Sequence, residues 1–413
     1  MTQKNRIDGG LIDRNIPLNF TFDGKKYSGF HGDTLASALL ANGINLVGRS
    51  FKYHRPRGIF TSDSSEPNAL VELINEDTKE PNSRSTTIQL FDGLTAQSQN
   101  CWPSLKYDIQ SINDCFAPLL TAGFYYKTFM WPKSFWERVY EPLIRRAAGL
   151  GELAPSTDPD HYDRGYRHCD LLIIGGGAAG LMAGLVAGRE GLNTILVEED
   201  FLFGGRLLGE NEEIDGLQCH DWVANTVKEL EAMPHVRLMP KTAVFGVFDQ
   251  KTYFAIERLS DQINSVGPRQ MIWEINTKHI ILASGATERH IAFGNNDRPG
   301  VMLASAMRDY TNRFAVRTAS RVAVFTSNDS GWLTARDLNQ KGIEVAAIID
   351  IRKKEEHQEI AKKNTQIPIY SEDQIIKVHG HNRVKAISLL NGAKISVDNI
   401  AVSGGWNPSI HLT

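Results

Sequence analysis

The stretch that decides the fold of this chain reads CDLLIIGGGAAG at residues 169–180, and TILVE follows at residues 194–198. The order is an apolar strand, a glycine turn, a helix and a second strand that ends in an acid. Gly175 permits the tight turn, Gly177 lets the backbone approach a pyrophosphate, and Gly180 lets the helix lie close to the sheet. The free amides at the helix N-terminus favour phosphates. The pattern therefore predicts a site for a dinucleotide, either NAD or FAD.

Further candidate site residues follow this unit. Glu198 ends the second strand, and its carboxylate can accept hydrogen bonds from ribose hydroxyls while it repels the 2′-phosphate of NADP. Glu199 either joins the ribose site or belongs to a solvated loop. Gly205 and Arg206 lie in a later turn that either brings amides and a guanidinium to the dinucleotide or is an ordinary surface turn. The other predicted cofactor contacts are Ala179, Val244, Gly285 and Gly405.

Composition restricts the class of protein. Of the 413 residues, 41% are hydrophobic and 23% are charged, and the net charge of −3 predicts no general attraction to nucleic acid or membranes. The N-terminus lacks the apolar core of a signal peptide, so we expect a cytoplasmic protein. The four cysteines have no CxxC spacing and the histidines no metal-ligand spacing, so we expect no metal site. No pattern identifies a catalytic residue.

One apolar stretch could be interpreted as a transmembrane helix. Residues 171–188 carry no charge and are long enough to suggest a transmembrane helix, with glycines at the spacing of helix-packing motifs. Three consecutive glycines, however, oppose one continuous helix. A helix that lies against a sheet uses the same small residues, so we expect no membrane span.

The first 167 residues predict a small β-rich domain and a connector. Residues 1–95 are expected to contain a hairpin at 18–29, a helix at 35–40, a strand at 69–74 and a polar loop at 77–85. Residues 96–167 are rich in Trp, Tyr, Phe and Pro, and predict a partly helical connector that packs on its neighbours and ends in an exposed linker at 154–167.

The rest of the chain predicts two similar units. Residues 168–292 form the first dinucleotide-binding domain, which a strand within residues 396–413 should rejoin and complete. Residues 293–395 repeat the plan in degenerate form, because Thr326 and Asn328 stand where glycines are needed and their side chains would obstruct phosphates. Since the chain stops soon after its last strand, we expect a fragment of a longer polypeptide. Further strands of the first domain are expected at 242–248, 252–258 and 271–275, with a buried strand at 278–286.

Four motifs resemble a known family. They are GRSFKYHRPRG at 48–58, the glycine turn at 175–180, TSNDS at 326–330 and SGGWNP at 403–408. With them, the whole chain resembles the N-terminal part of the alpha subunits of heterotetrameric sarcosine oxidases. The resemblance implies an α/β, glutathione-reductase-like flavoprotein fold with two dinucleotide-binding domains, preceded by a small α+β domain of the ferredoxin-like β-grasp type.

The resemblance also implies an activity that is shared among subunits. Such complexes oxidise sarcosine with oxygen to glycine, hydrogen peroxide and formaldehyde, or to methylene-tetrahydrofolate when tetrahydrofolate is present. NAD is expected in this chain, whereas FAD and a covalent FMN are expected on the beta subunit. The implied partners are the beta, gamma and delta subunits, and amine oxidation is expected on a partner chain.

The N-terminal domain resembles plant-type [2Fe–2S] ferredoxins, which need four cysteines, three of them close together. The loop expected to carry them reads IFTSDSS at residues 59–65 and contains none. We therefore predict that this domain holds no iron–sulfur cluster.

Three questions stay open from sequence alone. The basic run from Arg49 to Arg57 either meets a partner subunit or a flavin phosphate, stacks on single-stranded nucleic acid, or is a solvated loop. A second hypothesis for the whole chain is a stand-alone FAD-dependent oxidoreductase that uses NAD(P)H. A third is a non-catalytic structural subunit of an amine or opine dehydrogenase complex.

Overall fold

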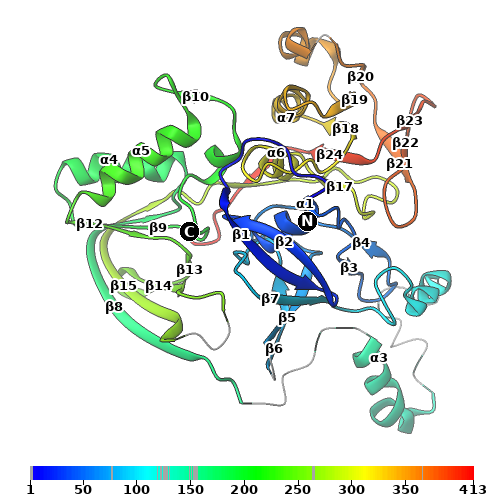
Figure 1. Ribbon diagram of the computed structural model, residues 1–413, viewed down its shortest axis with the longest axis horizontal. Helices are drawn as coiled ribbons and strands as arrows, with labels where there is room; N and C mark the ends of the chain where they lie inside the picture. The colour runs from blue at the N-terminus through cyan, green and yellow to red at the C-terminus, as the bar shows by residue number, and fades with distance from the viewer. Residues whose placement is uncertain are drawn as a thin grey trace.

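The computed structural model describes residues 3–413, except 76–77, 119, 121–122, 124–128, 130, 148, 150, 152–156, 263–265 and 365. Within this part, a β-rich N-terminal domain lies beside two α/β units, and a largely irregular connector runs from the first domain to the long strand β8 (Figure 1). None of the helices in the described ranges is long and apolar enough to cross a membrane.

The N-terminal domain is a mixed sheet with the strand order β2-β1-β7-β5-β6, packed on helix α1 (Leu35–Ala41). Thr34 begins α1 with a capping box, since its hydroxyl accepts the Ser37 amide and the Ser37 hydroxyl accepts the Thr34 amide. The predicted hairpin, helix and strand are confirmed. The strands are β1 (Asp13–Phe22), β2 (Lys25–His31), β5 (Leu70–Asn75), β6 (Thr78–Arg84) and β7 (Leu94–Ser98).

The predicted polar loop at 77–85 is wrong, because β6 occupies most of it. This strand lies at the edge of the sheet and pairs with β5 through its backbone. An edge strand needs no apolar face, and polar residues there discourage pairing with other chains. The polar composition that suggested a loop therefore suits an edge strand equally well.

Glu66 organises the loop at residues 59–65. Its carboxylate is buried and accepts four backbone amides, with Oε2 bonded to Phe60 and Thr61 and Oε1 to Asn68 and Ala69, at 2.6–3.0 Å. One buried side chain thus binds backbone amides on both sides of a loop without regular structure.

The Glu66→Gln variant is expected to be less stable by about 3 kcal/mol, because its NH₂ group would face amide donors that need an acceptor. Thermal unfolding and hydrogen exchange at residues 60–69 measure the loss. The exposed Glu355→Gln variant is the matched control. Equal stability of the two variants would contradict this role for Glu66.

The first α/β unit has the strand order β12-β9-β8-β15-β14-β13, in which the neighbours β12, β9, β8 and β15 run parallel and β14 and β13 pair antiparallel. Helices α4 (Ala178–Arg189) and α5 (Cys219–Glu231) lie together on one side of this sheet (Figure 1). Strands β13 and β14 have the predicted bounds. The strands are β8 (His161–Ile174), β9 (Thr194–Val197), β12 (Val236–Met239), β13 (Thr242–Phe248), β14 (Thr252–Arg258) and β15 (Pro268–Leu282).

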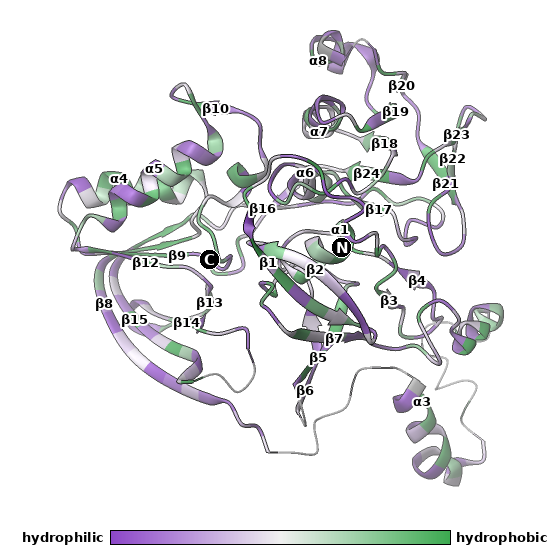
Figure 2. Cartoon of the chain, viewed as in Figure 1, coloured by the Kyte–Doolittle hydropathy of each residue, from purple (hydrophilic) through white to green (hydrophobic). Residues whose placement is uncertain are grey.

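Two expectations for this unit need correction. The expected linker at 154–167 is strand from His161 onward, and its residues 154–156 lie outside the described part. This half of β8 is hydrophilic (Figure 2), so its composition suggested a loop, but its backbone pairs with β15. In the expected buried strand at 278–286, β15 ends at Leu282 and β16 begins at Ala286, and Ile280 and Ile281 are 38% and 37% exposed. They are exposed because β14 stops pairing with β15 at Asn276.

The second unit is a parallel sheet with the order β17-β24-β18-β19-β20. Its main helices are α6 (Ala304–Asn312) and α7 (Asp329–Gln340), with the short α8 (Gln358–Ala361) after β19. The strands are β17 (Val301–Leu303), β18 (Arg321–Thr326), β19 (Glu344–Asp350), β20 (Ile369–Ser371) and β24 (Asn399–Ser403), with a separate small sheet of β21 (Ile375–His379), β22 (Ala386–Leu389) and β23 (Lys394–Ser396).

The expectation that the strand in 396–413 rejoins the first unit is wrong for the strand itself. β24 is buried along its whole length and lies between β17 and β18 in the second sheet. An apolar strand buried on both faces suits the middle of either parallel sheet, so its sequence does not say which sheet it enters. The residues after β24 do contact the first unit, where β25 (Trp406–Pro408) pairs with β16 (Ala286–Glu288).

One hydrophobic core joins the N-terminal domain to the second unit. Phe20 and Leu39 of the first domain belong to the same buried cluster as Tyr310 and Trp332 of the second unit. A hydrogen bond adds to this contact, since the Arg6 guanidinium, which is paired with the Asp33 carboxylate of its own domain at 2.7 Å, donates to the Phe314 carbonyl at 2.6 Å. The two regions therefore fold against each other, with the first unit beside them.

The connector contains short helices and many exposed apolar side chains. Trp131 is 84% exposed and Trp102 is 60% exposed, so the expectation that the connector packs on its neighbours fails for these residues. Its helical segments are η1 (Ile109–Phe116), η2 (Lys133–Phe135), η3 (Trp136–Tyr140) and α3 (Glu141–Ala147).

Candidate functional site

The glycine turn between β8 and α4 is closely packed. Gly175 has φ +103°, and a Cβ there would overlap the Ala283 carbonyl of the neighbouring strand. A Cβ on Gly180 would overlap the Gly175 carbonyl oxygen. Both positions therefore need glycine, as the sequence predicts, because the helix begins directly against the turn.

Space remains open on the outer side of this turn. A Cβ on Gly177 would meet no atom within 4 Å, and Ala178 and Ala179 at the start of α4 are exposed. Gly177 is the N-cap of α4, and no side chain caps this helix end. The first-turn amides are thus available to a ligand, which is the arrangement that binds phosphates at helix N-termini.

Glu198 is placed beside the turn. Its side chain is 8% exposed, with Oε2 accepting the Gly176 amide at 2.7 Å and Oε1 accepting the Asp200 amide at 3.0 Å. Burial raises the pKa of this carboxyl to about 7, against the lowering effect of the two amides. The predicted ribose acceptor therefore lies next to the predicted phosphate turn and titrates close to neutral pH.

Gly205 and Arg206 also lie at the turn. The Gly204 amide donates to the Gly176 carbonyl at 2.8 Å, and a Cβ on Gly205 would lie 3.2 Å from Gly177 Cα. The Arg206 guanidinium stacks 3.9 Å from the ring centre of Trp406. The turn at 204–206 therefore covers the phosphate turn rather than forming a separate surface loop.

Gly285 and Gly405 flank the two-stranded ribbon of β16 and β25. Both have positive φ, and a Cβ on either would meet no atom within 4 Å. The Ser409 amide donates to the Gly285 carbonyl at 3.0 Å, and the Arg289 amide donates to the Gly405 carbonyl at 2.8 Å. Gly405 thus leaves room beside Trp406, which contacts Arg206, and Gly285 leaves room at the Pro408 end of the ribbon.

Sequence reasoning missed Glu288 in this region. It is the direct cross-strand partner of Trp406 and is 6% exposed. Its Oε2 accepts the Ser305 amide near the start of α6 at 2.8 Å, and burial raises the pKa of its carboxyl. The sequence gives little signal for it, because Glu288 follows the strand in a polar segment with no motif around it.

Two predicted residues are placed differently. Glu199 is exposed, and its Oε1 accepts the Ser64 hydroxyl of the N-terminal domain at 2.9 Å. The Val244 side chain is buried in a core cluster with Tyr253 and Trp273. The contacts of these two side chains thus lie elsewhere, whereas Glu198 bonds the Gly176 amide of the glycine turn.

The second unit fills its own turn. The Asn328 side chain caps α7 by accepting the Ser330 amide at 2.9 Å, and a Cβ on Gly331 would overlap Thr326. Asp350, the acid at the end of β19, is fully buried and accepts hydrogen bonds from Trp332 and Arg352. The groups that a nucleotide would need are thus already bonded within the protein, as the degenerate sequence predicts.

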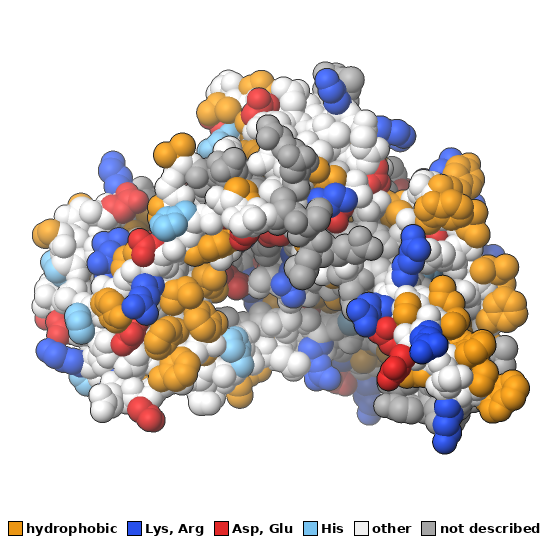
Figure 3. All heavy atoms as spheres, turned by 90° about the horizontal axis from the view of Figure 1, so that it is seen from below, with side chains coloured by type: hydrophobic (Ala, Val, Ile, Leu, Met, Phe, Trp, Pro, Cys, Tyr) orange, Lys and Arg blue, Asp and Glu red, His pale blue; other side chains and the backbone are white. Residues whose placement is uncertain are grey.

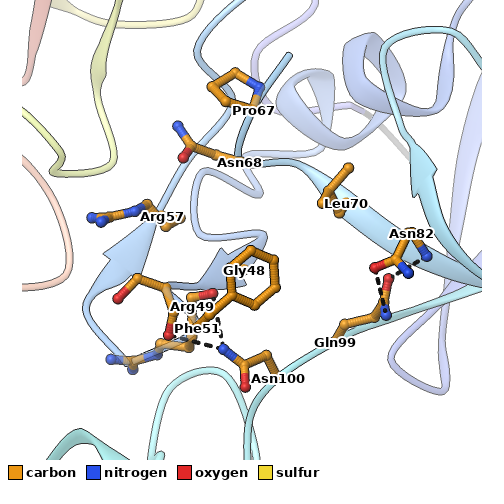
Figure 4. Close-up of a pocket in the computed structure, with 11 residues that line it drawn as sticks. Gly48, Arg49, Phe51, Arg57, Pro67, Asn68, Leu70, Asn82, Gln99 and Asn100 are labelled. Atoms are coloured by element: carbon orange, nitrogen blue, oxygen red, sulfur yellow. Dashed lines mark hydrogen bonds between the residues drawn. The ribbon is translucent and has the colours of Figure 1, made fainter. Parts of the chain in front are cut away.

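Several side chains of the basic run from Arg49 to Arg57 make contacts within the protein. Arg55 and Arg57 both pair with Asp297 of the second unit, and Arg49 is 6% exposed. A cavity of about 160 Å³ lies beside this run, with Asn100 donating to the Ser50 carbonyl at 2.9 Å (Figure 4). Its lining includes Arg57, but no residue of the glycine turn. The alternative in which the basic run is a solvated loop is therefore wrong for Arg49, whose side chain is buried.

The described residues contain no cluster of three or more His, Cys, Asp and Glu side chains that could hold a metal ion. The candidate site is consequently the glycine turn of the first unit with Glu198, the turn at 204–206 and the glycines of the β16–β25 ribbon.

Two protein families match parts of this chain. The family described as pyridine nucleotide-disulphide oxidoreductase matches residues 169–413, and a 2Fe-2S iron-sulfur cluster binding domain family matches residues 15–101. The chain therefore belongs to the pyridine nucleotide-disulphide oxidoreductase family.

The particular relatives agree with the motifs. The chain is 47% identical to sarcosine oxidase subunit alpha of Rhizobium meliloti over 409 residues, which are 98% of this chain and 41% of the relative. It is 33% identical to the same subunit of Corynebacterium sp. strain U-96 over 425 residues, covering 98% of this chain and 39% of the relative. The resemblance to sarcosine oxidase alpha subunits is confirmed, and the chain spans about two fifths of their length.

A solved structure supports the fold. An L-proline dehydrogenase from P. horikoshii is similar with a TM-score of 0.66 and 21% identity, covering 99% of this chain and 63% of that chain. Together with the two matched families, this confirms the predicted fold class, a ferredoxin-like domain followed by a flavoprotein fold with two dinucleotide-binding domains.

The residues present do not fit an iron–sulfur cluster. Cys101 is the single cysteine of the matched range 15–101, whereas a cluster of this kind needs four. In the loop where cysteines are expected, the Glu66 carboxylate binds the backbone amides instead.

Gly180→Ala is expected to destabilise the protein by about 3 kcal/mol, because the new methyl group would overlap the Gly175 carbonyl. Gly184→Ala in the same helix is the matched control, since a Cβ there lies 3.5 Å from Leu230 and alanine favours a helix. Thermal unfolding compares the two. Equal or higher stability of Gly180→Ala would contradict the close packing of the turn.

Proposed function

We propose that this chain is the NAD-binding part of the alpha subunit of a sarcosine oxidase complex. The observation that carries the proposal is the open, uncapped turn at Gly177 beside a buried acid, in a chain that is 47% identical to a sarcosine oxidase alpha subunit. The turn from Gly175 to Gly180, Ala179 included, would hold the pyrophosphate, and Glu198 would hold the adenosine ribose. NAD supplies a nicotinamide that can accept or release a hydride.

The other predicted contacts keep their place in this proposal. Gly205 and Arg206 would cover the pyrophosphate, and the open positions at Gly285 and Gly405 would accept the far end of the nucleotide. Glu199 and Val244 would contact the adenosine end through their backbone or after a side-chain movement. We also propose that the chain divides into four regions, and that β24 joins the last of them. The regions are residues 1–95, 96–167, 168–292 and 293–395.

The proposed reaction is the oxidative demethylation of sarcosine to glycine, with hydrogen peroxide and formaldehyde or methylene-tetrahydrofolate as products. Partner subunits beta, gamma and delta would complete the complex, with FAD and a covalent FMN on beta, in the cytoplasm. The amine would be oxidised on a partner chain.

A stand-alone FAD-dependent oxidoreductase is the second candidate. It would need a second nucleotide site for NAD(P)H, and the side chains of Thr326, Asn328 and Arg352 oppose one. A structural subunit, in which NAD never exchanges hydride, uses the same site. Spectra of the bound NAD during turnover with sarcosine separate that case.

The test of the proposal is the identity of the released nucleotide. The purified complex is denatured and its small molecules are identified by mass, with NAD expected in a one-to-one ratio to this chain. Gly177→Val should lower the NAD content about tenfold or more, because its side chain would occupy the space of the phosphates. Release of FAD alone from this chain would favour the stand-alone oxidoreductase, and release of no dinucleotide would overturn both.

The pH dependence of NAD binding provides a separate test. Only the ionised Glu198 can accept two ribose hydroxyls, and its pKa is about 7. Protonation below that pKa removes an acceptor, so affinity should fall as the pH falls, by about tenfold between pH 8 and pH 6. Isothermal titration measures this dependence. Glu198→Gln should bind more weakly and lose the dependence, and an unchanged pH profile in that variant would exclude this role.

A further inference from the structure

Residues 198–200, which we call the acid segment, follow β9 and are tied together by their last member. The Asp200 amide donates to Oε1 of Glu198 at 3.0 Å, and the Asp200 carbonyl accepts the Lys241 amide at 2.9 Å. A carboxylate oxygen has more than one acceptor position, so this bond leaves Glu198 able to accept a ribose hydroxyl as well. The place of Asp200 therefore decides where one oxygen of the proposed ribose acid lies.

A guanidinium from the second unit holds the side chain of Asp200. Arg313 follows directly after α6, and its Nη1 and Nη2 donate to the two carboxylate oxygens of Asp200 at 2.6 and 3.0 Å. A contact through two parallel hydrogen bonds fixes the direction of a carboxylate as well as its distance. Asp200 is thus bonded to the first unit through its backbone and to the second unit through its side chain.

Arg313 is itself held in one place. Its side chain is 6% exposed, and its guanidinium carbon lies 4.9 Å from the centre of the Phe201 ring and 4.7 Å from that of Phe314. The Arg313 carbonyl accepts the Leu11 amide of the N-terminal domain at 2.7 Å. Arg313 therefore lies where the N-terminal domain, the second unit and the acid segment meet, and it has little freedom to move.

The charges around Glu198 would otherwise oppose its ionisation. Burial, and after it the carboxylates of Asp200 and Glu199, raise the pKa of Glu198. Arg313 neutralises Asp200, and the Ser64 hydroxyl binds Glu199 at 2.9 Å. Figure 3 shows acidic and basic side chains interspersed over the face that it draws, so charge there is balanced locally rather than by one broad patch. Without Arg313, an uncompensated carboxylate would lie beside Glu198.

We propose that Arg313 is a positioning residue for the nucleotide site, which fixes Glu198 through Asp200 so that the Glu198 carboxylate can bind the adenosine ribose. This rests on the proposed function, in which Glu198 holds that ribose. A side chain that recognises a ligand needs further residues that lock it in the binding geometry. The second unit, whose own turn is filled, thus contributes to nucleotide binding in the first unit.

An NAD analogue that lacks the adenosine 2′-hydroxyl probes the position of Glu198. The unmodified full-length protein is incubated with isotope-labelled NAD in competition with this 2′-deoxy analogue, and the bound nucleotides are quantified by mass spectrometry. We expect a preference for NAD of about tenfold or more, because the analogue cannot make the hydrogen bond to a charged acceptor.

Arg313→Met removes the guanidinium that holds Asp200. The preference for NAD over the analogue should fall to about threefold or less, because Glu198 is no longer fixed at the ribose. Arg313→Lys covers the case in which the methionine variant does not fold. It keeps the charge but cannot bond both oxygens of Asp200 as a fork, so its preference should lie about threefold below that of the unmodified protein.

Arg269→Met is the matched control. The Arg269 side chain is 11% exposed and also pairs with two carboxylates, those of Asp160 at 2.6 Å and of Glu80. It lies near the start of β15, at the opposite end of this strand from the glycine turn. Thermal unfolding should show a similar loss of stability in the two methionine variants, while Arg269→Met keeps the preference of the unmodified protein.

The remaining outcomes overturn the inference in distinguishable ways. If both Arg313 variants keep the full preference, Arg313 does not position Glu198, and bound NAD leaves the proposed function standing. An equal fall in Arg313→Met and Arg269→Met would mean that the preference follows stability alone. If the unmodified protein binds NAD and the analogue equally, the inference fails together with the ribose role of Glu198. If it binds no dinucleotide, the proposed function itself fails.

Discussion

The contact of the α4 N-terminus with the end of β8 is the constraint on which the nucleotide site depends. Because no side chain separates Gly180 from the Gly175 carbonyl, the helix begins directly at the turn and its first amides face open space at Gly177. The same closeness places Gly176 within hydrogen-bond distance of Glu198 on the next strand. The positions that we propose for the phosphates and the ribose are therefore set by backbone packing, with few side chains involved.

The sequence was sufficient to predict the features that depend on local backbone chemistry. The end of β8 at residues 169–174, the glycine turn, α4 and the acid Glu198 follow from residue order alone, as do the hairpin of β1 and β2 and the bounds of β13 and β14. The family-level fold came from four motifs and was confirmed by the matched families. The degenerate second turn could be predicted because Thr326 and Asn328 carry side chains where none fit.

Features that depend on long-range pairing could not be predicted. β24 reads as a central strand, but nothing in its sequence selects one parallel sheet over another. β6 and the first half of β8 are polar because they lie at an edge or extend into solvent, so they resembled loops. Glu288 lies at the site because it pairs with Trp406. Arg49 is buried where its guanidinium bonds the Leu105 carbonyl. In each case the partner is distant in sequence.

The core shared by the N-terminal domain and the second unit explains why a ferredoxin-like domain without cluster ligands is kept. Tyr310 is fully buried, and its hydroxyl donates to the Thr61 carbonyl in the very loop that lacks the cysteines. Removing the domain would expose Tyr310 and its neighbours, and the remaining chain would present a large hydrophobic surface to solvent. The N-terminal domain therefore has a structural role, and we expect a shortened chain that starts at β8 to aggregate rather than to act as a minimal nucleotide binder.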